Sequence, residues 1–225
     1  MTRKTSPPPG TAYSNLEFHE ETHEVGNLSC KIVRPLDSSK LLDLIPQEEF
    51  EKRDEIMPYW ADLWPGALGL ARYTSDLALK GLRVCDLGCG LGLNGITAAL
   101  KGADVFFADY DPEALIAAKN NFFINGFSAF RGAAADWNRW PSIETFDLIL
   151  GADIIYEERN HIPVIRLISS ALKKGGKALL SDPFRPHYKK FRSAAVSSGF
   201  FVSEKSVNTE FLKKSFRVNI LELTA

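Results

Sequence analysis

Short apolar runs alternate with stretches of helical periodicity through the second half of the chain. Each run is the length of a buried strand, and each helical stretch is long enough to cross back over a sheet. The apolar runs are 82–87, 103–111, 146–156 and 177–182, and the helical stretches are 93–102, 112–126, 158–176 and 188–199. Strands that alternate with helices predict an α/β fold with a mostly parallel sheet covered on both faces.

The end of the chain departs from this alternation. Residues 200–207 and 216–223 both have strand character, and no helical stretch separates them. Two consecutive strands joined by a short connection form a hairpin, so we expect one edge of the sheet to be antiparallel.

The beginning of the chain has a different composition. Residues 1–14 are rich in Pro, Ser and Thr and are expected to be disordered. Residues 16–34 alternate weakly around a Gly-Asn turn, which predicts a hairpin, and 37–55 suggests short helices. We therefore expect an N-terminal extension over 15–57 and the main domain over 58–225, with Pro65 near the start of its first helix.

Bulk composition limits the class of protein. The 225 residues are 45% apolar and 24% charged, which suits one large globular α/β domain. A formal net charge of −1 provides no general field for nucleic-acid phosphates, so we expect no nucleic-acid partner. No apolar run approaches the length of a membrane span, and the first residues lack the apolar segment of a secretory signal, so we expect no membrane association.

Three cysteines and four histidines form no short metal-ligand motif, so no metal site is expected. An odd number of cysteines without a disulfide pattern suits a reducing compartment, and we expect the protein to be cytoplasmic.

The stretch VCDLGCGLGLNG (84–95) contains two overlapping glycine patterns. From Gly90 it is the dinucleotide fingerprint G-x-G-x-x-G, with Asp109 about 20 residues further on. From Asp86 it is D-x-G-x-G-x-G. In a dinucleotide site the first glycine follows the strand at once, and here Gly88 does so whereas Gly90 comes late. The Asp86 carboxylate would also repel a pyrophosphate, so the second pattern is favoured.

A ligand with a cationic head fits the second pattern, and S-adenosylmethionine is such a ligand. Gly88 and Gly90 allow the backbone to approach its methionine and ribose parts closely. Asp86 is predicted beside its ammonium group, and Asp109 is predicted to accept hydrogen bonds from both ribose hydroxyls. The alternative is a tight strand-to-helix turn that binds no ligand.

The segments VCDLGCGLG, ADYDPEA and FDLILGADIIYE resemble motifs of the class I, seven-β-strand, S-adenosylmethionine-dependent methyltransferases. The resemblance covers roughly 58–223 and implies a three-layer, Rossmann-like sandwich with a seven-stranded sheet. More narrowly, PYWADLWPG, ADWNRW, ADIIY and SDPFRP are similar to the D-x-x-Y protein-lysine methyltransferases, in particular the group acting on the β-subunit of electron transfer flavoprotein. Here the D-x-x-Y motif is Asp153 to Tyr156.

The resemblance implies roles for residues around the cofactor. Trp64, and less certainly Trp60, would lie over its methionine end, where an aromatic face attracts a cation, although both would also suit the packing of an apolar cap. Asp136 and Trp137 would bind the adenine, the alternatives being a solvated loop acid and a core side chain. The full set of expected cofactor-binding residues is Trp64, Asp86, Gly88, Cys89, Gly90, Asp109, Tyr110, Asp136, Trp137 and Ala152. Cys89 has no histidine neighbour in the sequence to support a catalytic thiol, so we expect it to be a small filler.

The resemblance places Asp153 and Tyr156 on the acceptor side as the catalytic residues. A lysine is mostly cationic in water and must lose a proton before it attacks a methyl group. A carboxylate can position the ammonium, while desolvation lowers the pKa of the amine. Alternatively, Asp153 caps the following helix and Tyr156 only packs. Arg185, in SDPFRP, is either part of the substrate mouth or a partner in a salt bridge.

The predicted function is therefore methyl transfer from S-adenosylmethionine to a lysine of a protein substrate. No N-P-P-Y or D-P-P-Y stretch follows the fourth strand, which argues against methylation of adenine or glutamine side chains. The first alternative is a methyltransferase for a small-molecule amine, with a closed pocket around Asp153. The others are a non-catalytic cofactor-binding domain and an NAD-dependent oxidoreductase, which the glycine register disfavours.

Overall fold

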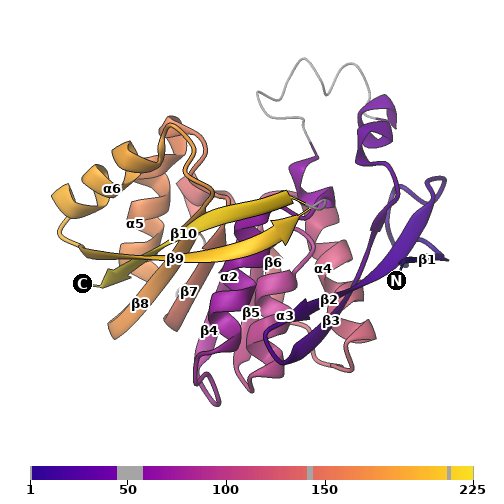
Figure 1. Ribbon diagram of the computed structural model, residues 1–225, viewed down its shortest axis with the longest axis horizontal. Helices are drawn as coiled ribbons and strands as arrows, with labels where there is room; N and C mark the ends of the chain where they lie inside the picture. The colour runs from indigo at the N-terminus through magenta and orange to yellow at the C-terminus, as the bar shows by residue number, and fades with distance from the viewer. Residues whose placement is uncertain (1, 45–57, 141–143, 212–213, 225) are drawn as a thin grey trace.

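The computed structural model describes residues 2–44, 58–140, 144–211 and 214–224. Its main sheet has seven strands in the order β6-β5-β4-β7-β8-β10-β9 (Figure 1). The strands are β4 (Arg83–Leu87), β5 (Asp104–Asp109), β6 (Gly132–Ala134), β7 (Phe146–Ala152), β8 (Leu172–Asp182), β9 (Phe201–Phe211) and β10 (Lys214–Thr224). Strands β4 to β8 run parallel, and β10 is antiparallel to both β8 and β9. The predicted α/β sheet with an antiparallel C-terminal hairpin is confirmed.

Helices cover both faces of the sheet, which gives three layers. The helices are α2 (Pro65–Ser75), α3 (Leu93–Leu100), α4 (Pro112–Ile124), α5 (His161–Ala171) and α6 (Tyr188–Ser197). Alternate residues of each buried strand face opposite layers: Val84 belongs to the core beneath α2, α3 and α4, and Cys85 to the core beneath α5 and α6. Because both of its faces are buried, the central strand β7 is apolar at nearly every position.

Local signals set most helix starts. Pro65 occupies the first turn of α2, as expected. Asp111 caps α4 by accepting a hydrogen bond from the backbone N–H of Glu113 at 2.9 Å.

One expected boundary differs from the structure, and one strand was not expected. The helical stretch that was expected to reach Gly176 ends at Ala171, because Leu172 already pairs with Phe146 of β7 and starts β8. The three-residue strand β6 left no sequence signal, since two of its three residues are exposed and none is large and apolar.

The N-terminal region forms a second sheet, β1 (Thr2–Thr5), β2 (Phe18–Val25) and β3 (Leu28–Pro35). The β2–β3 hairpin was predicted, and its turn uses Gly26 at φ 63°. The hairpin docks on α4 through the buried Asn121, whose side chain accepts from the N–H of Val33 at 2.8 Å and donates to its carbonyl.

Residues 2–14 differ from the prediction of disorder. Strand β1 pairs with β2 along its whole length, so backbone hydrogen bonds hold it although its composition is polar. Of the short helices expected over 37–55, the 3₁₀ helix Ser38–Leu44 is present, and 45–57 lies outside the described residues.

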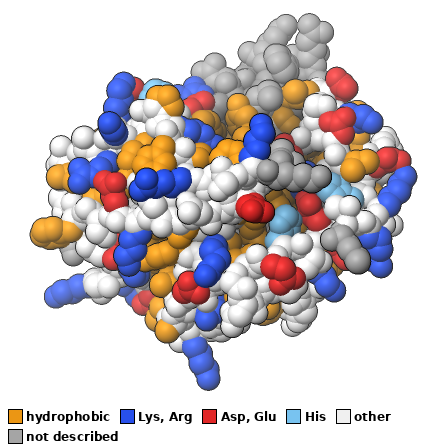
Figure 2. All heavy atoms as spheres, in the orientation of Figure 1, with side chains coloured by type: hydrophobic (Ala, Val, Ile, Leu, Met, Phe, Trp, Pro, Cys, Tyr) orange, Lys and Arg blue, Asp and Glu red, His pale blue; other side chains and the backbone are white. Residues whose placement is uncertain are grey.

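The face of the molecule shown in Figure 2 carries charges of both signs. Lys and Arg side chains are interspersed with Asp and Glu over the face shown in Figure 2. Across the described part of the chain, none of the helices combines the length and the apolar character that a membrane crossing requires.

Candidate active site

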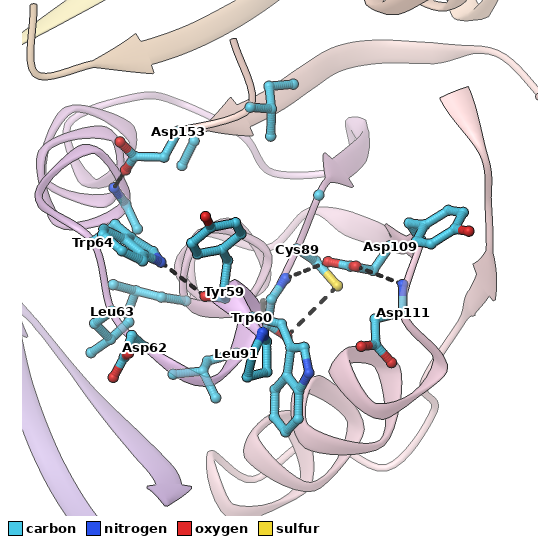
Figure 3. A pocket seen from close by; sticks show the side chains of 18 of the residues that line it. Tyr59, Trp60, Asp62, Leu63, Trp64, Cys89, Leu91, Asp109, Asp111 and Asp153 are labelled. Atoms are coloured by element: carbon cyan, nitrogen blue, oxygen red, sulfur yellow. Dashed lines mark hydrogen bonds between the residues drawn. The ribbon is translucent and has the colours of Figure 1, made fainter. Parts of the chain in front are cut away.

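A cavity of about 690 Å³ opens at the carboxyl ends of the central strands (Figure 3). It lies where the strand order reverses, because β4 has β5 on one side and β7 on the other. Loops diverge at such a switch point and leave room for a ligand. The volume falls within the range of small-molecule and cofactor sites, about 300–1,000 Å³.

The loop after β4 forms one wall of the cavity. Gly88 and Gly90 have φ values of 65° and 50°, a left-handed conformation that glycine adopts without steric cost. A Cβ atom at position 90 would lie 3.3 Å from the carbonyl oxygen of Trp60, so the two segments approach too closely for a side chain. The loop therefore presents bare backbone to the cavity.

Asp109 fixes this loop from the end of β5. One carboxylate oxygen accepts from the N–H of Gly90 at 2.8 Å and the other from the N–H of Asp111 at 3.0 Å, as Figure 3 shows. Burial is the main influence on this group and raises its pKa to about 6. Each carboxylate oxygen has a second lone pair, so the role in binding ribose hydroxyls stays a prediction.

Asp86 lies elsewhere than expected. Its carboxylate accepts from the N–H of Gly95 at 2.8 Å and does not line the cavity. Complete burial, opposed by that hydrogen bond, raises its pKa to about 8. This hydrogen bond ties β4 to the first turn of α3, so the structure does not bring Asp86 to the cavity, where it was expected beside a ligand ammonium.

Asp153 stands at the opposite wall, directly after β7. Its φ of 57° is unusual for a residue other than glycine and indicates a position held by its surroundings. One oxygen accepts from the N–H of Ala67 at 3.1 Å, in the first turn of α2. A Cβ at Gly66 would overlap this carboxylate, so the glycine is required.

Asp153 is thus a cap, but not of the helix expected. Glu157 and Asn160 occupy the cap positions of the helical segments that follow it, and Asp153 bonds instead to α2, more than 80 residues away in sequence. Burial raises the pKa of Asp153 to about 6, and the Arg185 guanidinium opposes that shift.

Arg185 reaches the same carboxylate from the loop after β8. Its Nη1 donates to the other oxygen of Asp153 at 2.5 Å and lies 3.3 Å from a carboxylate oxygen of Asp182. Its guanidinium carbon lies 5.9 Å from the ring centre of Trp64. Arg185 was expected either at the substrate mouth or in a salt bridge. The structure shows that it forms salt bridges and also lines the cavity.

Three aromatic rings surround this end of the cavity. Tyr59 packs edge-on against both Trp64 and Tyr156, with ring centres 5.9 and 5.7 Å apart. The indole N–H of Trp64 donates to the Tyr59 carbonyl at 2.9 Å. The ring of Trp64 also lies beside the Arg185 guanidinium, which contacts Asp153, and its expected place over the methionine end of the cofactor stays a prediction.

Most of the predicted site residues come together. All twelve line the cavity except Asp86 and Asp136. Asp136 instead caps the short helix η3 (Trp137–Arg139) by accepting from the N–H of Asn138 at 2.8 Å, while Trp137 lines the cavity. Adenine binding by Asp136 stays a prediction.

Several lining residues escaped the sequence analysis, among them Tyr13, Tyr59, Asn94 and Glu113. Tyr13 comes from the segment expected to be disordered, which Glu113 holds in place by accepting from the Thr11 hydroxyl at 2.7 Å and the Ala12 N–H at 3.1 Å. Nothing local to residues 11–13 indicates this contact. Tyr59 could have been found, because it lies inside the PYWADLWPG motif.

The charge of the lining discriminates between ligands. Five acidic residues line the cavity: Asp62, Asp109, Asp111, Glu113 and Asp153. Among the described lining residues, Arg185 is the single Lys or Arg. Such a surface repels the pyrophosphate of a dinucleotide and attracts a cationic ligand. The lining therefore fits S-adenosylmethionine, whose sulfonium and ammonium are positive, and argues against NAD.

Cys89 packs in the loop as a small side chain. Burial raises the pKa of its thiol well above the usual value, and the nearby carboxylates of Asp109 and Asp86 act in the same direction. The thiol is therefore protonated, as expected for a residue that fills space and is not a nucleophile. All three cysteines are free and buried.

Comparisons with known proteins agree with this site. A family model described as a methyltransferase domain matches residues 78–216. The electron transfer flavoprotein beta subunit lysine methyltransferase of Danio rerio is 35% identical over 135 residues, which cover 58% of this chain and 52% of that protein. The histidine protein methyltransferase 1 homolog of Dictyostelium discoideum is 32% identical over 128 residues, 53% of this chain and 41% of that protein. The chain thus spans about half the length of these relatives.

A solved structure supports the fold. The 16S rRNA N2 G1207 methyltransferase of T. thermophilus, in complex with AdoMet and guanosine, has a TM-score of 0.63 at 13% identity, over 97% of this chain and 52% of that chain.

Proposed function

Since the chain belongs to the methyltransferase domain family, we propose that it transfers a methyl group to a lysine side chain of a protein. Family membership supports the predicted enzyme class, and the acidic lining of the cavity fits the predicted cofactor S-adenosylmethionine. The lysine acceptor and the roles of individual residues belong to the proposal.

One observation carries the choice of an amine acceptor: a buried carboxylate on the cavity wall. Asp153 is 8% exposed and already holds a cation, Arg185, whose guanidinium carbon lies 5.9 Å from the ring centre of Trp64. A carboxylate next to an aromatic face is a suitable environment for an ammonium group.

The cofactor supplies an activated methyl group, and the protein supplies position and charge. Gly88, Gly90 and Asp109 would hold the cofactor's methionine and ribose parts on the β4–β5 side of the cavity. Asp153 would orient the acceptor amine on the β7 side, after its ammonium has released a proton to water, and stabilise the positive charge that develops on nitrogen as the methyl group is transferred. Tyr156 and Trp64 would exclude water, which lowers the pKa of the amine and favours its neutral, nucleophilic form. Alignment of amine and methyl group accounts for most of the rate in such a displacement.

The name of the Danio rerio relative makes the β-subunit of electron transfer flavoprotein the first candidate substrate. A protein acceptor also suits the rim of the cavity, where Tyr59 is 42% and Tyr110 is 55% exposed. A small-molecule amine methyltransferase would favour a cavity closed at this end. The predicted cytoplasmic location and the absence of nucleic-acid and membrane partners stay predictions.

Methyl-labelled S-adenosylmethionine provides the test. The protein is incubated with purified β-subunit of electron transfer flavoprotein and, separately, with a cell lysate. We expect a labelled protein whose modified residue, located by mass spectrometry, is a lysine. Asp153→Asn should abolish the label, whereas Asp147→Asn, a matched change at the other end of β7 where Asp147 pairs with Lys173, should retain it.

Three results would contradict parts of the proposal. Label on histidine would move the acceptor to the class named for the Dictyostelium relative. Label confined to small molecules would favour the small-amine alternative. Cofactor binding without any transfer would favour a non-catalytic domain.

A further inference from the structure

The acceptor end of the cavity contains a cation that belongs to the protein itself. Both oxygens of Asp153 are engaged: the backbone of Ala67 binds one and the Arg185 guanidinium binds the other. An ammonium could reach this second oxygen of Asp153 only by displacing the Arg185 guanidinium. The carboxylate proposed to orient the acceptor is therefore already neutralised.

The surroundings of Arg185 are those that an acceptor ammonium would require. Its guanidinium lies between two carboxylates, Asp153 and Asp182, and beside the ring of Trp64. Asp182 is fully buried, and its second oxygen anchors the loop by accepting from the backbone N–H of Arg185 at 2.6 Å. The side chain of Arg185 is 27% exposed, so it has room to move toward solvent.

The charges explain why a resident cation is needed. Asp153 and Asp182 are both buried, and two unneutralised carboxylates at this spacing would repel each other at a large cost in free energy. One guanidinium that contacts both removes that cost. If a second cation binds Asp153, Arg185 still has Asp182, so each carboxylate then has its own partner.

We propose that Arg185 is an exchangeable counter-ion: it occupies the ammonium subsite at Asp153 while the acceptor is absent and withdraws onto Asp182 when an alkylammonium binds. This inference rests on the proposed function for the identity of the acceptor, but the exchange itself does not require turnover. Arg185 is a positioning residue that sets how readily a cationic side chain enters, and Asp182 provides the place to which it withdraws.

The test measures binding of n-butylammonium, which has the end of a lysine side chain. ¹⁵N-labelled protein is titrated in the presence of S-adenosylhomocysteine, and the indole N–H signal of Trp64 reports occupancy. Arg185→Gln removes the competitor and should tighten binding about tenfold, the size of one partly screened charge contact. Asp182→Asn removes the alternative partner of Arg185 and should weaken binding by a similar factor, about tenfold.

The critical result is that Arg185→Gln and Asp182→Asn change the affinity for n-butylammonium in opposite directions. If Arg185 and Asp182 only held the loop in shape, both substitutions would weaken binding, and the inference would fail. Arg192→Gln is the matched control and should leave the affinity unchanged, because Arg192 of α6 pairs with Glu204 of β9 and neither lines the cavity. Arg185→Lys keeps the charge and should bind n-butylammonium less tightly than Arg185→Gln, even if the latter is less stable.

This titration separates the inference from the proposed function. Opposite shifts without methyl transfer to any lysine would support the counter-ion exchange and refute the lysine acceptor. Methyl transfer to lysine together with weaker binding in both variants would keep the proposed function and overturn the exchange.

Discussion

The Asp86 carboxylate of β4 accepts a hydrogen bond from the backbone N–H of Gly95, in the first turn of α3, at 2.8 Å. This contact joins the strand and the helix on either side of the glycine loop. Burial raises the pKa of Asp86 to about 8, so the group is largely protonated near neutral pH in the folded protein.

Asp86 should therefore make folding less favourable as pH rises. Its ordinary pKa is 3.8, so between about 4 and 8 the folded state binds a proton that the unfolded state has released. Stability from this group is present at low pH and is lost as pH rises through that window. Asp86→Asn should flatten the dependence of the melting temperature on pH between 5 and 8, and should leave the cofactor dissociation constant within about threefold. If the melting temperature of Asp86→Asn depended on pH as that of the unchanged protein does, the raised pKa of Asp86 would be contradicted. A much larger loss of cofactor affinity would indicate a role for Asp86 at the ligand.

Asp109→Asn should weaken cofactor binding. The change leaves one acceptor oxygen for the two backbone donors, Gly90 and Asp111, and removes a negative charge from the cavity. We expect the dissociation constant for S-adenosylmethionine to rise about 10- to 100-fold, equivalent to one or two charge-assisted hydrogen bonds. Calorimetry measures this directly. Asp104→Asn, at the exposed start of the same strand, where Asp104 pairs with Arg131, is the control and should change little.

Cation binding at Asp153 should weaken below about pH 6. The carboxylate has a pKa of about 6, so it is charged above that pH and neutral below it. The groups facing it are Arg185, which favours the charged form, and Asp182, which opposes it. Titration of n-butylammonium tests this, because the probe stays protonated from pH 5 to 8 and only the protein changes. An affinity that is constant across this range would contradict the assignment of Asp153 as the ammonium ligand.

The N-terminal segment should contribute to cofactor retention. Glu113 accepts hydrogen bonds from Thr11 and Ala12 with separate oxygens, and so holds Tyr13 at the cavity. Glu113→Gln replaces one acceptor by a donor, so we expect faster proteolysis within residues 2–14 and a several-fold faster release of S-adenosylhomocysteine in stopped-flow measurements. The control is Glu24→Gln, on the hairpin away from the cavity. Unchanged release with faster proteolysis would show that the segment is ordered but does not cover the ligand.

Local signals in the sequence were sufficient for most of the secondary structure. Apolar runs of strand length, the Pro65 start of α2 and the Asp111 cap of α4 act over a few residues, so they are visible without the fold. Strand β6 and the end of α5 were missed or misplaced, because pairing with neighbouring strands, and not local preference, determines them.

The glycine loop shows the same division within the site. Its spacing correctly placed Gly88, Gly90 and Asp109 at one cavity, because a strand, its loop and the end of the next parallel strand are neighbours by rule. It did not show which way the Asp86 side chain turns. The carboxylate could bind either the N–H of Gly95 or the ligand, and only the tertiary structure shows that it binds Gly95.

The sequence by itself determined the class of fold, the position of the cofactor loop and a set of twelve site residues, all of which line the cavity except Asp86 and Asp136. The tertiary structure decided the contacts between distant segments: Asp153 with Ala67 and Arg185, and Glu113 with the segment at residues 11–13. The physical reason is that periodicity and capping act over a turn or a strand, whereas these hydrogen bonds join residues between about 30 and 100 positions apart in sequence. Such contacts exist only after the order of the strands has brought the segments together.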